Sequence, residues 1–109
     1  MTPADNTDKT DLSSQDYIFP DSNSRYLTDE DLSGYSSDQL ELAKNEIYAR
    51  HGRKFVTQRI ADYFNSKSWY KGTVEPETFD ADTSVFNEYE VANIQKIADT
   101  EGKLRSEGK

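Results

Sequence analysis

The stretch Asn45-Glu46-Ile47-Tyr48-Ala49-Arg50-His51-Gly52 predicts the last turns of a helix and anchors the interpretation of the fold around it. Gly52 is the expected stop, because helices commonly close on a residue in the left-handed conformation, which glycine adopts freely. Arg50 and His51 precede this stop, where the negative end of the helix dipole favours cations. Tyr48, His51 and Gly52 are therefore interpreted as structural residues at a helix end.

Helix starts elsewhere in the chain share one local pattern. A capping residue is followed three positions later by Asp, Glu or Gln, and apolar residues flank the pair, as in a capping box within a hydrophobic staple. The pattern occurs at Thr28/Asp31, Ser36/Gln39 and Asn87/Glu90. It predicts a short helical turn over 28–33 and longer helices over 37–51 and 88–103. A further helix is expected over 58–66, opened by Thr57.

The spacing of apolar residues agrees with these helices. Each helix carries one apolar stripe, formed by Leu40, Ala43 and Ile47 in the first, by Ile60, Tyr63 and Phe64 in the second, and by Val91, Ile94, Ile97 and Ala98 in the third. Residues 67–86 contain Gly72 and Pro76 and are predicted to be a long irregular connection packed by its own aromatic side chains. The fold class is thus mainly α: a small domain of three to four helices with a long aromatic-rich irregular connection.

The beginning of the chain has a different composition. Residues 1–24 hold five Asp against Lys9, a net charge of −4, and show no hydrophobic periodicity. Such a segment buries too little apolar surface to offset the entropy of ordering it, so 1–24 is predicted to be a disordered acidic linker and 25–104 the helical domain. Tyr17-Ile18-Phe19-Pro20 is the exception. It either docks on the domain as an extended strap or is an apolar patch within the linker.

Composition limits the classes of function. Hydrophobic residues make up 33% of the 109 residues and aromatic residues 12%, which favours a core of few but large side chains. There is no cysteine, so disulfides and thiolate metal sites are excluded. No apolar run reaches the ~20 residues that span a bilayer, so no membrane insertion is expected. If the protein is exported, its leader or anchor is expected to lie outside this chain.

Charge is unevenly distributed. The net charge of −8 argues against a nucleic-acid partner. Residues 44–71 nevertheless hold seven Lys or Arg against two acids, a net of +5, and residues 72–101 hold eight acids against one Lys, a net of −7. Two interpretations stay open. The two halves fold against each other and their charges cancel, or residues 44–71 present a basic face to an anionic polymer, with Arg50, Arg53, Lys54 and Arg59 as the candidate binding residues.

Residues that suggest catalysis or metal binding have structural explanations. His51, the only histidine, continues an apolar stripe and is expected to bond backbone through a ring nitrogen; ligand contact and catalysis are the lesser alternatives. Arg50 is expected to pair with Glu46 or to hold the following loop. The run from Asp80 to Ser84 resembles a calcium loop but lacks the required Gly and Glu, so no metal site is predicted. No cofactor is expected.

Trp69 and Tyr70 follow the helix expected over 58–66 and lie between Lys67 and Lys71. Aromatic rings beside cations can stack on sugar rings, which makes both residues candidate binding residues. The same rings can instead fill the gap between helices in a core with few aliphatic side chains. Core packing is the favoured interpretation of the two.

Several spaced motifs resemble the YARHG domain, a bacterial domain presumed to be extracellular. They are Asp31-Leu32, the run Asn45–Gly52, Phe55, Tyr63-Phe64, Trp69-Tyr70 and Glu90-x-x-Asn93-Ile94. The resemblance spans about residues 25–101 and brings no known catalytic residue. It implies an extracellular or cell-surface location.

These observations lead to one expectation about function. The chain is expected to be a monomeric, non-enzymatic binding module at the cell surface, with cell-wall polymer or another protein as its partner. The alternative is an accessory domain that supports a neighbouring domain and has no ligand of its own.

Overall fold

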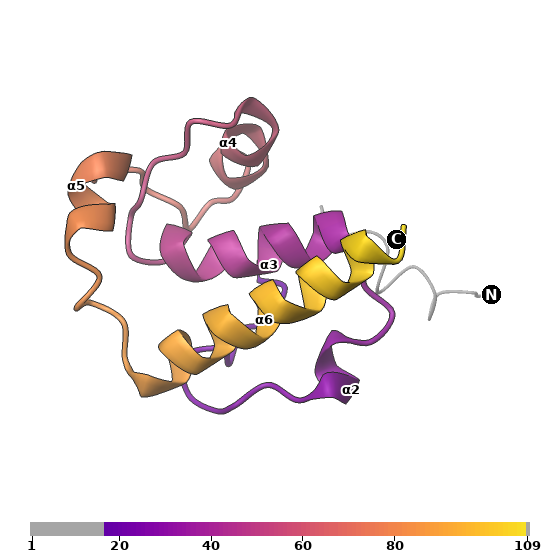
Figure 1. Ribbon diagram of the computed structural model, residues 1–109. Coiled ribbons are helices and arrows are strands. Elements are labelled where there is room, and N and C mark those ends of the chain that lie inside the picture. Colours follow the sequence, from indigo (N-terminus) through magenta and orange to yellow (C-terminus); the bar gives the residue numbers. More distant parts are fainter. Residues whose placement is uncertain (1–16, 109) are drawn as a thin grey trace.

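The computed structural model describes residues 17–108, which form five helices (Figure 1). The prediction of disorder over residues 1–16 lies outside the described residues. The helices are α2 (Asp29–Leu32), α3 (Ser37–Ala49), α4 (Gln58–Asn65), α5 (Pro76–Ala81) and α6 (Glu88–Ser106). The mainly helical fold class is confirmed. Within residues 17–108, no helix combines the length and the apolar character needed to cross a membrane.

The local start signals are confirmed in detail. Thr28, Ser36 and Asn87 are the capping residues of α2, α3 and α6, and each forms a complete capping box. Thr57 precedes α4 as predicted, but its side chain makes no capping hydrogen bond. A capping box joins groups three residues apart, so the sequence alone is enough to specify it.

The centre of the molecule is the pair α3 and α6, which lie side by side and run in opposite directions (Figure 1). In the same view α4 and α5 lie on the α3 side of this pair, and α2 lies on the α6 side. Side-chain contacts at both ends are consistent with the antiparallel arrangement, because His51 reaches Glu90 at one end and Arg105 reaches Asp38 at the other.

Hydrophobic side chains form two clusters. The strap cluster lies along α3 and α6 and is built from buried aliphatic residues and one ring: Ile18, Phe19, Leu27, Leu32, Leu40, Ala43, Ile47 and Ile97. The aromatic cluster centres on Ala49, Ile60 and Phe64, against which Phe55, Tyr63, Trp69 and Tyr70 pack. The stripes predicted for the first and second long helices therefore face these cores.

The buried face of α6 differs from the predicted one. Val91 is 55% exposed, whereas the buried positions are Glu90, Asn93, Ile97 and Glu101. Three of these four are polar. Glu90 and Asn93 make the hydrogen bonds described below, and Glu101 forms an ion pair with Lys44 at 3.2 Å. A polar group with such a partner is tolerated in a core. Of the predicted stripe, Ile97 is buried and Ile94 packs against the strap cluster, so the apolar stripe predicts the helix and part of its inner face but misses the buried polar positions.

The long connection contains a helix that the sequence analysis did not predict. α5 begins at Pro76, and proline is favoured at the first helical position because its missing N–H needs no partner there. Phe79 on this helix is buried and its ring approaches Tyr48 and Phe86. The remainder of 67–86 is irregular, apart from an isolated parallel bridge between Arg53 and Val74.

Residues 17–27 form an extended and turning segment, here called the strap, that packs on the helix pair. Ile18, Phe19, Ser22 and Leu27 are buried. Residues 17–24 fall within the predicted linker, with docking of Tyr17–Pro20 as the open alternative, and the structure shows the docked arrangement. The packed part of the chain accordingly begins before residue 25.

Candidate functional site

The corner at Gly52 is built as the sequence predicts. Gly52 has φ of +91°, and its carbonyl accepts hydrogen bonds from the N–H groups of Thr73 and Val74, both at 2.9 Å. A Cβ placed on Gly52 would lie 2.8 Å from Thr73 Oγ1. Both the left-handed conformation and the close approach of the 72–74 segment therefore require glycine.

His51 contacts a carboxylate rather than the backbone. Its Nε2 lies 2.8 Å from Oε2 of Glu90, and Phe86 packs edge-on against its ring. Glu90 also accepts the backbone N–H of Asn87 as part of the α6 capping box. The expected backbone bond is wrong, because the start of α6 brings a carboxylate to the end of α3. Tyr48 lies nearby and packs on the same Phe86 ring.

Arg50 takes neither of its two expected roles. Its guanidinium donates to the carbonyls of Phe19 and Pro20, at 3.5 and 3.0 Å, and lies over the ring of Tyr17 with a separation of 4.5 Å. The Glu46 carboxylate accepts hydrogen bonds from the strap instead of pairing with Arg50. Arg50 therefore holds the segment that precedes the helices rather than the loop that follows.

Two buried polar side chains fix the strap. Glu46 of α3 is 1% exposed and accepts the backbone N–H groups of Ile18 and Phe19, at 2.7 and 3.0 Å. Burial raises the pKa of Glu46 to about 7, against the lowering effect of these two N–H groups. Asn93 of α6, also 1% exposed, is the second of these side chains.

Asn93 makes three hydrogen bonds to the strap. It accepts the N–H of Leu27 at 2.8 Å and donates to the carbonyls of Ser22 and Arg25, at 2.7 and 2.9 Å. Its amide thus meets both donors and acceptors of the backbone, which a carboxylate could not do. The strap is consequently attached to both central helices through its main chain.

The predicted basic residues are largely paired within the chain. Arg53 makes a two-pronged contact with Asp80 at 3.0 and 2.9 Å, and this contact holds the pKa of Asp80 below its usual value. Lys54 lies 2.7 Å from Glu75. Arg59 pairs with Glu41. The pairs of Arg53 and Lys54 join the basic and acidic halves of the sequence, which favours the interpretation that their charges cancel.

Trp69 and Tyr70 are half-buried and pack against Phe64. Tyr17 of the strap stacks on Trp69 with ring centroids 4.8 Å apart. The hydroxyl of Tyr70 donates to the carbonyl of Arg53 at 2.7 Å. Both aromatic residues thus take part in the packing of the aromatic cluster, with Trp69 also contacting the strap.

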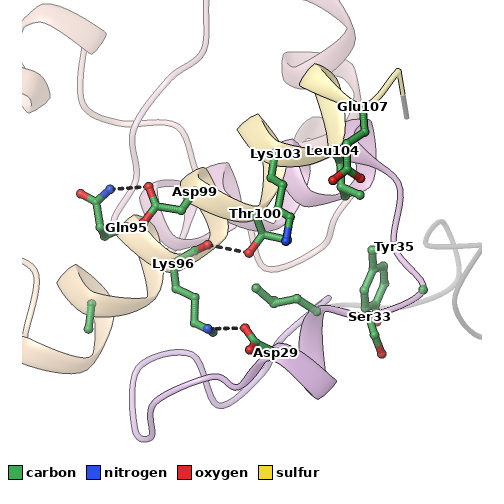
Figure 2. A pocket seen from close by; sticks show the side chains of 13 residues that line it. Asp29, Ser33, Tyr35, Gln95, Lys96, Asp99, Thr100, Lys103, Leu104 and Glu107 are labelled. Carbon is green, nitrogen blue, oxygen red and sulfur yellow. Dashed lines mark hydrogen bonds and ion pairs between the residues drawn. The ribbon is translucent and has the colours of Figure 1, made fainter.

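A concavity lies elsewhere, between α2 and α6 (Figure 2). This groove has a volume of about 940 Å³. Its apolar lining comes from Leu32, Tyr35, Ala92 and Leu104, and its polar lining includes Asp29, Lys96, Asp99, Lys103 and Glu107. Figure 2 shows Lys96 reaching from α6 to Asp29, at 2.6 Å.

None of the six predicted binding residues lines this groove. Its two walls, 29–35 and 92–107, are far apart in the sequence, so local patterns do not reveal it.

The sequence analysis also missed the buried polar residues Glu46, Glu90 and Asn93 as a set. Their burial on the inner faces of α3 and α6 becomes visible only when the helices are packed against the strap.

Among the described residues, no three His, Cys, Asp or Glu side chains are grouped so as to hold an ion. In the calcium-like run, Asp80 pairs with Arg53, and Asp82 accepts the N–H of Ser84 at 3.0 Å. These two acids serve local structure.

The fold and its contacts define a small helical domain in which an antiparallel helix pair holds an N-terminal strap. The family model of the YARHG domain matches residues 15–102, and the chain belongs to this family. The family is a presumed extracellular domain whose function is unknown. The matched region includes the strap, which agrees with its packing on the helices. No curated protein and no solved structure matched the chain.

Proposed function

We propose that the chain is a non-enzymatic binding module of an exported bacterial protein, and that its partner at the cell surface is a protein segment seated in the groove between α2 and α6. The groove supports this proposal by its size and mixed lining. An apolar floor that includes Leu32 and Leu104 lies among side chains of both signs, such as Lys103 and Asp99. Protein surfaces offer apolar and charged groups in this combination.

An anionic wall polymer fits the site residues less well. Arg53, Lys54 and Arg59 would have to leave their present carboxylate partners to bind phosphates or uronic acids. The groove offers two Lys against three acids, so it has no excess of positive charge. A partner that brings both apolar and charged side chains therefore suits the described surface better than a polyanion.

The non-enzymatic part of the proposal rests on how the most reactive side chains are used. His51 bonds Glu90 and packs against Phe86 at the junction of α3 and α6. General acid–base catalysis needs a group within hydrogen-bond reach of a substrate proton. His51 instead closes a contact between two helices, so we assign it to the fold.

The accessory-domain alternative keeps one observation in its favour. The motifs that carry the family resemblance make internal contacts: Glu46 and Asn93 hold the strap, and His51 and Glu90 join the helix ends. A family motif used wholly for packing suits a domain whose task is mechanical support. The experiment below separates the two functions.

The test blocks the groove and compares a matched substitution beside it. Ala92 lines the groove and Val91, the next residue, is 55% exposed and does not. Ala92→Trp should fill the groove, whereas Val91→Trp should leave it open. Purified full-length chains of both variants and the wild type are immobilised and incubated with detergent-solubilised envelope proteins and, separately, with washed cell-wall sacculi at two salt concentrations.

The proposal predicts an envelope protein that is retained by the wild type and Val91→Trp and lost by Ala92→Trp, with all three chains folded by circular dichroism. Equal, salt-sensitive retention on sacculi by all three would contradict the groove and favour wall polymer. Absence of any specific retention would favour the accessory role.

A further inference from the structure

The strap residues 17–20 are held in the manner of a bound peptide. Glu46 accepts two consecutive main-chain N–H groups, those of Ile18 and Phe19. One helical turn later, Arg50 donates to the main-chain carbonyls of Phe19 and Pro20. A carboxylate on α3 and a guanidinium at its end thus bind the donors and acceptors of a bent stretch of backbone.

Side-chain sites accompany these main-chain contacts. Ile18 and Phe19 are 5% and 7% exposed within the strap cluster, and Phe19 meets Tyr35 edge-on at 5.4 Å. Tyr17 lies between the Trp69 ring and the Arg50 guanidinium, at 4.8 and 4.5 Å. Main-chain hydrogen bonds that supply affinity, with side-chain pockets that supply specificity, are the elements of peptide recognition.

Glu46 and Arg50, which bind the main chain of the strap, lie within α3 and at its end, whereas Trp69 lies in the irregular segment after α4. Arg50 is the C-terminal capping residue of α3, and Trp69 packs in the aromatic cluster. The segment 17–20 is in neither helix nor strand. Residues 17–20 are thus held by contacts to α3 and to the aromatic cluster and not by a helix or sheet of their own, so a segment that carries the same groups can make the same contacts.

We propose that the α3 face under the strap is a peptide-binding site, occupied here by the chain's own residues 17–20, and that it accepts a similarly bent segment of a partner protein in their place. The segment that fits carries an aromatic, an aliphatic and an aromatic residue in succession, with free N–H groups on the second and third. The chain's own strap competes with it. This inference does not depend on whether a protein segment binds in the groove between α2 and α6. The two sites have one residue in common, Tyr35.

The test uses the full chain with the substitution Ile18→Ser, which weakens the strap and leaves Glu46, Arg50 and Trp69 intact. The probe is a capped synthetic peptide with the sequence of residues 15–22. The matched probe has the same sequence but carries N-methyl groups on the nitrogens of Ile18 and Phe19. Binding is followed by emission of Trp69, the only tryptophan, and by the melting temperature.

The expected result is saturable binding of the plain peptide to Ile18→Ser, about tenfold or more tighter than to the wild type, because a weakened strap leaves more of the site free. The N-methylated peptide should bind at least about tenfold more weakly, since each lost bond is to a charged group. Adding Glu46→Gln should reduce the difference between the two probes, because glutamine offers one acceptor oxygen in place of two. Equal binding of both probes, or of neither, would overturn the proposal.

Two further measurements keep the test decisive. If Ile18→Ser does not fold, hydrogen exchange of the wild type decides: the amides of Ile18 and Phe19 should exchange by local opening, faster than that of Ile47 in α3. Exchange of all three at one common rate would overturn the proposal. Concentration-dependent dimers of the wild type without peptide would assign the site to a second copy of the chain and overturn the assignment to a different protein.

Discussion

The two hydrophobic clusters are stabilised in different ways. The strap cluster is mostly aliphatic, and Glu46 and Asn93, both nearly inaccessible, fix its outer segment. The aromatic cluster is built from stacked and edge-on rings, and its edge is tied by ion pairs whose acids are more than half exposed, such as Asp80 and Glu75. Buried polar contacts are costly to break, whereas exposed ion pairs contribute little. Polar substitutions should therefore have unequal effects in the two regions.

The largest effect is expected for Asn93→Leu. The change keeps the side-chain volume similar but leaves the Leu27 N–H and the Ser22 and Arg25 carbonyls without their partner. We expect a loss of about 3–5 kcal/mol in the free energy of unfolding, or a strap that detaches. Urea denaturation measures it. Gln95→Leu, on the exposed side of the same helix, is the control and should change stability by less than about 0.5 kcal/mol.

The second effect is a pH dependence that comes from Glu46. Its pKa is about 7 in the folded chain against 4.5 ordinarily, so the folded state binds a proton more tightly than the unfolded state. Stability from this group is fully present below pH 4.5 and is lost as pH rises through 7, by up to about 3 kcal/mol. Glu46→Gln should flatten the dependence between about pH 5 and 8. Parallel curves for the two chains would show that the carboxylate is not buried as described.

A third comparison uses two glycines. Gly52→Ala should destabilise the chain by about 1–2 kcal/mol, because Ala resists positive φ and its Cβ would press on Thr73. Gly102 lies inside α6, and a Cβ placed on it would meet nothing within 4 Å beyond the backbone of its own helix. Gly102→Ala should therefore stabilise the chain by about 0.5–1 kcal/mol. Melting temperatures that shift in the same direction would contradict the description of the Gly52 corner.

The smallest effect is expected at the edge of the aromatic cluster. Asp80→Asn removes the ionic partner of Arg53, but Asp80 is 53% exposed. The free energy of unfolding should fall by less than about 1 kcal/mol, and by less still at high salt. Thermal unfolding at two salt concentrations measures this. A loss as large as that of Asn93→Leu would remove the distinction between the two regions.

The comparison also shows what the sequence could reveal. Capping boxes at Thr28, Ser36 and Asn87 and the stop at Gly52 depend on residues a few positions apart, and all were predictable. α5 lies within the stretch predicted to be irregular, although Pro76 marks its first turn.

The contacts between distant segments were not predictable in this way. The predicted inner face of α6 was incomplete because Glu90 and Asn93 look like surface residues until their partners, 39 and 66 or more positions away, are known. The partners of Arg50 and Arg53, and the groove between α2 and α6, likewise depend on how distant segments meet. Local chemistry thus predicts the elements, while the candidate sites arise from packing.

The central claim is that the Glu46 carboxylate holds the strap by its main chain, and NMR titration tests it most directly. The amide protons of Ile18 and Phe19 and the carboxyl carbon of Glu46 would be followed from about pH 4 to 9, a range that spans both the ordinary and the raised pKa. The account predicts that all three signals titrate together with a midpoint near 7. A Glu46 midpoint near 4.5, with amide signals of Ile18 and Phe19 that do not follow it, would contradict the account.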